Sequence, residues 1–495
     1  MSRRPLPGGT SADALLLTLI KLVTIVLGLV VTRLLSQYLS VYDYGTYSQV
    51  MLVVSTVNTL TILGMIDGVN YFFCSEKDPQ RREEYISTIF TLQCLIGVAA
   101  GMVVMLLTGP ICLHFANPDL KKLLIFGAVL PLPINLLSML QVLLVSVGKA
   151  RMLAVRNLVV SLVRLAVVIL TVTLIKNVGV VLGATLVMDL AQLVLFGVIL
   201  RRCGCRIRIG RAGKQMLRHI FTYCAPMGVF TAISALNRDC DKYLIALMTD
   251  TRTLAVYANA SKILPFDIVT NSFCTVLIPH ITRRVSEGDK AGAGKLYRLF
   301  LEISLLSTGI LCCAALAASP QLMRLLYTEK YAEGLPIFCI YILVDLLRFT
   351  NITLVLSAAG KTARLMCYSL GALGMNLVLN VVFYRWMGIC GPALATLATT
   401  FFMGLLILRS GAAVLETSLR KLFDGKKLLV FLLESLALTA ALYALQTRLE
   451  GWGVPNFVIL VLICGAYGGV MLLLQGKGLL RDLKLVNKSS EGEKE

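Results

Sequence analysis

Long hydrophobic runs separated by short polar stretches form the main pattern of the chain. Residues 85–107, for example, contain no charged side chain. About 20 apolar residues suffice for a helix to cross a bilayer. Uninterrupted runs favour helices over barrel strands, whose hydrophobic residues alternate with polar ones. We therefore predict an all-α integral membrane protein with fourteen spans. They are placed at 13–37, 46–73, 85–108, 120–147, 152–175, 179–200, 218–248, 254–280, 293–318, 333–359, 365–387, 389–409, 427–447 and 455–475.

Basic residues gather in every second loop between these spans. One set of loops holds Lys77, Arg81, Arg82, Lys149, Arg151, Arg201, Arg202, Arg206, Arg208, Arg211, Lys214, Arg283, Arg284, Lys290, Lys295, Lys361, Arg364, Arg420, Lys421, Lys426 and Lys427. The opposite loops hold few cations. Because cytoplasmic loops carry an excess of lysine and arginine, the first set indicates the cytoplasmic side. We predict a multi-pass membrane protein with both termini in the cytoplasm.

Short segments recur in the same order in two halves of the chain. Gly148-Lys149-Ala150-Arg151 follows span four, and 360–364 (GKTAR) follows span ten. Segments 179–185 and 388–393 open spans six and twelve. Six helices is an even number, so two such copies have the same orientation, as in parallel-repeat transporters. We predict six-helix lobes at 1–210 and 211–410, related by a pseudo-twofold axis along the membrane normal. Two extra transmembrane helices at 411–476 and a cytoplasmic tail at 477–495 complete the chain.

The composition agrees with a membrane protein and excludes several other classes. The chain is 57% hydrophobic and 15% charged, whereas a soluble domain has about 25% charged residues. The net charge of +20 is explained by the cytoplasmic loops, so no nucleic-acid partner is expected. The 14 cysteines and three histidines show no metal-ligand spacing. No phosphate-binding loop or catalytic triad is present. We expect neither a metal, a cofactor nor an enzymatic activity.

A charged cluster interrupts the apolar run near the middle of the chain. The segment 237–242 reads Asn-Arg-Asp-Cys-Asp-Lys and lies inside span seven. A charge at the centre of a membrane helix costs about 2.5–3.5 kcal/mol, so four charges should face protein or a water-filled cavity. Helical spacing brings Arg238 near Asp241 and Lys242, and Asp239 near Lys242.

Several short motifs together with the span count identify a family resemblance. The motifs are Arg33-Leu34-Leu35, 42–47 (YDYGTY), 241–245 (DKYLI), 254–257 (LAVY), Lys262 and Pro265. With fourteen spans arranged as six, six and two, the chain resembles polysaccharide-biosynthesis flippases of the O-antigen type. These belong to the multidrug/oligosaccharidyl-lipid/polysaccharide (MOP) exporter superfamily, together with lipid II flippases and multidrug exporters.

The resemblance implies a flippase that moves undecaprenyl-pyrophosphate-linked oligosaccharide, a cell-surface polysaccharide precursor, to the outer leaflet by alternating access. The implied partners are this substrate, membrane lipid, and a polysaccharide polymerase with glycosyltransferases. Two alternatives stay open, namely a cation-coupled multidrug exporter and a lipid II-type flippase. A membrane glycosyltransferase or polymerase is disfavoured because every predicted outer loop is short.

Cations within the spans are the natural partners of a diphosphate. We predict a central cavity in which Arg33, Arg164, Arg238, Lys242 and Lys262 bind the substrate head group. For Arg33, snorkelling or structural pairing is the competing interpretation. Lys262 and Asp267 are five residues apart in span eight, so each should have a partner elsewhere.

Acids within the spans are candidates for charge balance or for coupling to H+ or Na+. They are Asp67, Asp189, Asp239, Asp241, Asp267 and Asp345. For Asp345 we favour a structural pair with Arg348, which lies three residues later. Asp67 lies near the predicted cytoplasmic end of span two, where a charge is easier to accommodate than in the middle of the membrane.

Overall fold

Helices account for nearly all of the secondary structure in the computed structural model. It describes residues 11–491 except 77, 148, 203–206, 209–213, 267–269, 271–276, 278–280, 282, 286 and 360, and no strand occurs among them. Nine described helices are long and apolar enough to cross a membrane, or ten if one bent pair counts as a span. The stretch 363–414 is counted there once although it holds two helices. The chain is thus an all-α, multi-pass membrane protein, and the number fourteen stays a prediction.

The chain divides into two compact units, residues 1–256 and 257–495. The first contains α1 (Ser11–Tyr38), α2 (Val41–Ile62), α3 (Met65–Ser75), α4 (Pro79–Leu106), α5 (Thr108–His114), α6 (Leu120–Val129), α7 (Pro131–Ser146), α8 (Ala150–Leu174), α9 (Val178–Arg202) and α10 (Lys214–Met248). The boundary falls within α11 (Thr251–Ala260). The lobe limits at 210 and 410 and the repeat symmetry remain predictions, and Gly148 and Gly360 lie outside the described residues.

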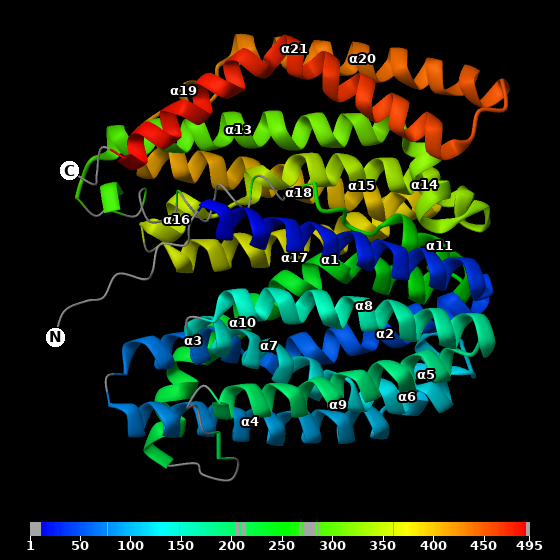
Figure 1. The fold of residues 1–495 in the computed structure, drawn as a ribbon, viewed down its shortest axis with the longest axis vertical. Coiled ribbons are helices and arrows are strands. Elements are labelled where there is room, and N and C mark those ends of the chain that lie inside the picture. Colours follow the sequence, from blue (N-terminus) through cyan, green and yellow to red (C-terminus); the bar gives the residue numbers. More distant parts are fainter. Residues whose placement is uncertain are drawn as a thin grey trace. The chain divides into compact units, whose positions relative to one another are not determined.

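Helix packing in the first unit places α10 next to α2 and α3, and α1 along α8 (Figure 1). Its core includes Met65, Val69 and Phe72 of α3 with Ile89 of α4 and Leu144 of α7, each at most 2% exposed. Within a bilayer, close packing of such side chains stabilises the association of helices through van der Waals contacts. α3, α4 and α7 therefore form one packed core, and α10 contacts α3 and α4.

The predicted second span is broken rather than continuous. α2 ends at Ile62, and α3 begins at Met65 with a bend of 40°. Leu63 and Gly64 between them have φ angles of 42° and 69°, a left-handed conformation that ends an α-helix. Span four is likewise divided at Leu130, where Pro131 starts α7. Proline fits the first position of a helix because its missing N–H has no partner there in any case.

The second unit contains α13 (Lys290–Ala317), α14 (Ser319–Tyr327), η1 (Glu329–Gly334), α15 (Leu335–Leu347), η2 (Arg348–Asn351), α16 (Leu354–Ala358), α17 (Thr362–Met387), η3 (Gly388–Cys390), α18 (Gly391–Val414), α19 (Leu419–Leu422), α20 (Gly425–Gly451) and α21 (Asn456–Glu491). α20 and α21 pack on α13 (Figure 1). Their shared core includes Phe431, Ile463 and Tyr467.

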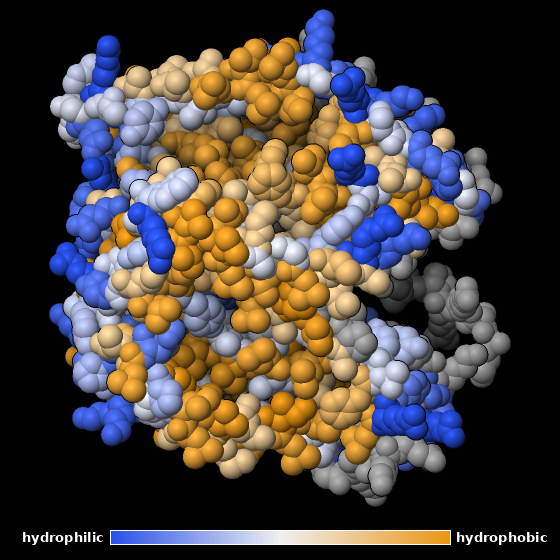
Figure 2. Space-filling model, turned by 180° about the vertical axis from the view of Figure 1, so that it is seen from behind, coloured by the Kyte–Doolittle hydropathy of each residue, from blue (hydrophilic) through white to orange (hydrophobic). Residues whose placement is uncertain are grey.

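The outward faces of the helices are apolar, as a bilayer requires. In Figure 2 hydrophobic residues form a band along the helices, and hydrophilic residues gather toward the helix ends. Leu106 of α4 and Leu473 of α21 are 82% and 83% exposed. In water such exposure would be costly, whereas in a membrane hydrocarbon covers these side chains.

Candidate functional site

The charged cluster of span seven lies in the C-terminal half of α10. Lys242 Nζ is 2.7 Å from Asp239 Oδ1, and Arg238 Nε is 4.0 Å from Asp239 Oδ2. The predicted i,i+3 pairing of Asp239 with Lys242 is therefore present. One carboxylate lies between two cations, so this group of three side chains carries a net charge of +1.

The members of the cluster differ sharply in exposure. The Arg238 side chain is 54% exposed, compared with 14% for Asp239 and 22% for Lys242. Asp241 is only 1% exposed, and its Oδ1 accepts the backbone N–H of Lys242 at 2.8 Å. Asp241 is thus part of the packed structure, while the Arg238 side chain is exposed.

Two hollows of unequal size adjoin this cluster. A small pocket lined by Asp239 and Tyr243 of α10 and by residues of α2 has a volume of about 10 Å³, which is the space of about one water molecule. A larger groove of about 660 Å³ runs between α2, α4 and α5 and is lined mostly by apolar side chains. Thr56, Leu60 and Tyr243 line both hollows. The apolar groove therefore reaches the charged cluster at Tyr243, and the pocket beside Asp239 is too small for more than about one water molecule.

Arg164 lies on α8 and belongs to a second charged group. Asp189 of α9 interacts electrostatically with both Arg164 and Arg156 and accepts a hydrogen bond from Gln192 Nε2 at 3.1 Å. Arg164 is exposed, whereas Arg156 is 8% exposed. Arg156 was missed in the sequence, although it precedes Arg164 by about two helical turns in the same span. The two arginines could have been read together as one cationic stripe.

Lys262 lies outside a helix, contrary to the prediction that span eight continues through it. α11 ends at Ala260, and the next residues are irregular. The backbone N–H of Leu264 donates to Asp345 Oδ2 at 3.0 Å, and Asp345 Oδ1 is 3.4 Å from Arg348 Nη1. A backbone polar group freed from a membrane helix needs such a partner. Asp345 is 3% exposed and forms the pair with Arg348 that we predicted, while Lys262 is exposed.

Three predicted residues remain, and the structure describes two of them. Arg33 is half-buried on α1, which packs along α8. Asp67 is exposed in the first turn of α3, near Tyr223 and Cys224 of α10. Asp267 lies outside the described residues. No group of three or more metal-ligating side chains occurs in the part of the chain that the structure describes.

The motif at 42–47 holds the start of α2 against its neighbours. Asn117 Nδ2 donates to Thr46 Oγ1 at 3.0 Å and to Gln49 Oε1 at 2.7 Å. Gln49 Nε2 donates to Thr251 Oγ1 at 3.1 Å, and Tyr42 Oη donates to Asn117 Oδ1 at 3.0 Å. Buried polar groups in a membrane need such partners. The motif is thus a packing element that joins α2, the turn before α6, and α11.

Gly45, within that motif, lets α11 approach closely. A Cβ at Gly45 would lie 2.3 Å from the Thr251 carbonyl oxygen. In the turn before α11, Asp250 Oδ1 accepts the Thr253 backbone N–H at 3.0 Å. A hydrogen bond from the Thr253 side chain is the main cause that holds the pKa of Asp250 below its usual range. The contact between α2 and α11 is therefore tight and locally well ordered.

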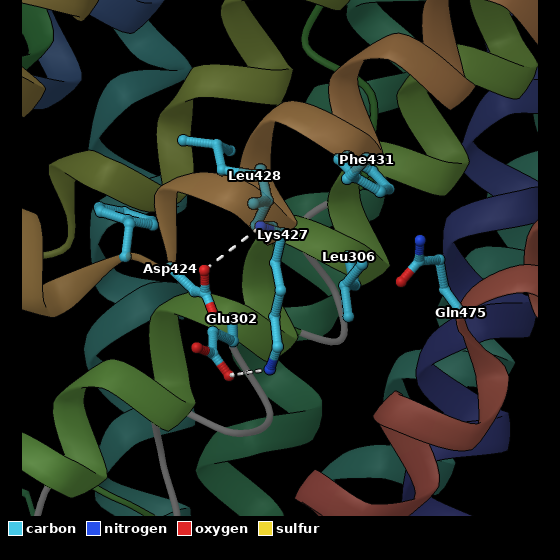
Figure 3. Close-up of a pocket in the computed structure, with 9 residues that line it drawn as sticks. Glu302, Leu306, Asp424, Lys427, Leu428, Phe431 and Gln475 are labelled. Carbon is cyan, nitrogen blue, oxygen red and sulfur yellow. Dashed lines mark hydrogen bonds and ion pairs between the residues drawn. The ribbon is translucent and has the colours of Figure 1, made fainter.

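A further pocket of about 140 Å³ lies where α20 and α21 meet α13. Figure 3 shows Glu302 and Lys427 pointing toward one another, with Nζ 4.0 Å from Oε2. Arg298 Nε is 2.9 Å from Glu302 Oε1. Asp424 accepts the backbone N–H groups of Lys426 and Lys427, as an N-cap residue does. The positive and negative side chains around this pocket compensate each other. Their ion pairs join α20 to α13 and leave no excess positive charge.

Known proteins provide independent support for the fold. The family model described as "Polysaccharide biosynthesis protein" matches residues 30–336. No curated protein matches the sequence. The lipid II flippase MurJ in an inward closed conformation is similar with a TM-score of 0.69 and 17% identity, over 92% of this chain and 99% of that chain.

Multidrug transporters have the same fold. An inward-facing MATE family transporter of the MOP superfamily aligns with a TM-score of 0.63 and 11% identity, over 80% of this chain and 96% of that chain. A MATE transporter from Vibrio cholerae in the bent form gives 0.55 and 13%, over 83% and 98%. At this identity the likeness concerns the fold alone. Taken with the family match over more than half of the chain, it shows that the protein belongs to the polysaccharide biosynthesis protein family, with the fold of MOP superfamily transporters.

Proposed function

We propose that the protein is a flippase for undecaprenyl-pyrophosphate-linked oligosaccharide in the bacterial cytoplasmic membrane. It moves this precursor from the cytoplasmic to the outer leaflet by alternating access, without covalent change. Membership of the polysaccharide biosynthesis family supports the sugar part of the substrate. The similarity to a lipid II flippase supports a lipid carrier.

One observation carries the proposal, namely an apolar groove that reaches α10 at Tyr243, next to a charged cluster whose most exposed member is the cation Arg238. Arg238 offers a guanidinium that can bind a phosphate with two parallel hydrogen bonds. The groove of about 660 Å³, lined by Leu60 and Tyr243 among others, adjoins the same cluster. A lipid-linked diphosphate needs both a cation for its phosphates and an apolar groove for its hydrocarbon chain. A drug cation needs an acidic or aromatic cavity instead, whereas the most exposed charge of this cluster is the cation Arg238, which favours the lipid.

In this proposal Arg33, Arg164, Arg238 and Lys242 of the first unit bind the diphosphate and sugar head group, and the assignment of Lys262, in the second unit, stays a prediction. Asp239 holds Lys242 in the empty protein and releases it when phosphate enters. Asp189 does the same for Arg164. Any coupling to H+ or Na+ falls to the intramembrane acids, and Asp189 would link such coupling to the binding residue Arg164, with which it interacts.

Transport by purified protein in liposomes tests the substrate. We expect protein-dependent flipping of fluorescent undecaprenyl-pyrophosphate-oligosaccharide at least about tenfold faster than that of lipid II, a preference of about 1.4 kcal/mol. A cationic dye should not be moved. Faster movement of lipid II would reassign the protein as a peptidoglycan-precursor flippase. Movement of the dye alone, driven by an ion gradient, would establish the drug-exporter alternative.

The proposed orientation places both termini and the basic loops in the cytoplasm. In a variant without native cysteines, Glu287→Cys should resist a membrane-impermeant maleimide in intact cells and react after the cells are opened. Arg252→Cys, on a predicted outer turn and exposed, should react in intact cells. Labelling of Glu287→Cys from outside would reverse the orientation.

A further inference from the structure

Arg156 is a buried cation whose hydrogen bonds are incomplete. Its side chain is 8% exposed, and its Cζ lies 4.4 Å from the Phe196 ring centroid. Nη1 donates to Asn157 Oδ1 at 2.8 Å, and Nη2 donates to Gln192 Oε1. Nε has no hydrogen-bond partner among the described residues. An unused donor on a buried charge is costly, so an additional acceptor at this position would stabilise the protein.

A groove of about 640 Å³ opens beside this guanidinium, between α8 and α9. Its lining consists of Lys149, Met152, Val155, Arg156, Val159, Val160, Leu195 and Ile199. Lys149 is exposed at the start of α8, and Val155 and Val159 are 47% and 53% exposed. The groove therefore combines two cations with an aliphatic wall.

The chemistry of this lining selects its occupant. Two cations with no carboxylate among the lining residues favour an anion, and the aliphatic wall favours a hydrocarbon chain. No lining residue other than the two cations offers a hydrogen bond to a sugar hydroxyl. Basic pockets between membrane helices at the cytoplasmic side bind anionic lipid head groups, and Lys149 lies in a loop that we predict to be cytoplasmic.

We propose that the groove between α8 and α9 is a binding site for an anionic phospholipid of the inner leaflet. The phosphate lies between Lys149 and Arg156, and an acyl chain follows Val155, Val159 and Leu195. Arg156 also acts on Asp189, which acts on Arg164. Lipid in the groove therefore influences the charge balance of α8 without occupying the substrate site. This site is independent of the proposed transport activity.

Lipid retention by the purified full-length chain tests the site. Native mass spectrometry after titration with phosphatidylglycerol or phosphatidylcholine should show preferential retention of phosphatidylglycerol. Because loss of Arg156 would leave Gln192 Oε1 without its donor and would remove one of the two cations that act on Asp189, the variants are Lys149→Gln and Val159→Trp, both at exposed positions. We expect Lys149→Gln to weaken retention about fivefold, the effect of one cation near a lipid surface. Val159→Trp should weaken it at least as much by filling the groove.

Matched controls lie on the same helix or directly after it. Lys176→Gln changes an exposed lysine just beyond the far end of α8, and Val163→Trp enlarges a 48% exposed valine that does not line the groove. Both should retain lipid as the wild type does. Equal retention of the two lipids, or wild-type retention by both test variants, overturns the proposal. Displacement of phosphatidylglycerol by an undecaprenyl-pyrophosphate-sugar, but not by excess phospholipid, would assign the groove to the substrate instead.

Discussion

Replacing Arg238 by glutamine is expected to reduce the flipping rate at least about tenfold while leaving protein abundance near the wild-type level. A hydrogen bond to a charged group contributes about 1.5–3 kcal/mol, which corresponds to a tenfold or larger effect if Arg238 binds the diphosphate. The structural cost is small, since Arg238 is 54% exposed and Asp239 keeps Lys242 at 2.7 Å. An exposed ion pair contributes about 0–1 kcal/mol to stability.

Arg164→Gln should behave in the same way, because Arg164 is exposed and Asp189 keeps Arg156 as a neighbour. Arg238→Lys should retain part of the activity, since it keeps the charge but loses the two-pronged geometry. Flipping in liposomes and complementation of a polysaccharide-deficient strain measure the effect, and immunoblotting measures abundance. Arg385→Gln, at an exposed arginine of α17, is the matched control. Full activity of the double variant at Arg164 and Arg238, or activity that always falls together with abundance, contradicts the cationic-site proposal.

Interactions between residues close in sequence could be predicted because the helical period determines them. Asp239 and Lys242 are three apart and form an ion pair, as do Asp345 and Arg348. The all-helical membrane class followed from the length of the apolar runs. Membership of the family followed from short motifs such as 42–47, whose packing role became visible only in the structure.

Interactions between distant segments could not be predicted from the sequence. Arg156 rests on Phe196 and Gln192 of another helix, and no local pattern indicates that pairing. The break at Leu63 and Gly64 also escaped prediction, because hydrophobicity continues across it. Lys262 was expected within a helix, but a carboxylate 81 residues away in sequence, that of Asp345, bonds the irregular backbone at Leu264. Such features depend on which helices meet.

Replacing Gly45 by alanine is expected to prevent α11 from packing on α2 and to remove most folded protein. The added Cβ would lie 2.3 Å from the Thr251 carbonyl oxygen and 2.8 Å from its Cγ2. The oxygen belongs to the backbone, so it cannot turn aside as a flexible side chain can. Overpacking of this kind costs about 1–3 kcal/mol. Separating the two segments would also break the bond from Gln49 to Thr251, which adds about 1–3 kcal/mol for a buried group left unpaired.

The effect is measured as the unfolding temperature of the detergent-purified protein, with size-exclusion chromatography as the readout of folded protein. Gly197→Ala is the matched control, because a Cβ at Gly197 in α9 meets nothing within 4 Å. Alanine is favoured over glycine within a helix by about 1 kcal/mol, so the control should be as stable as the wild type or more stable. If Gly45→Ala unfolds at the wild-type temperature, α2 and α11 do not make this contact. The motif 42–47 would then need an explanation other than packing, and its exposed Tyr42 and half-buried Asp43 would become the residues to test for substrate transport.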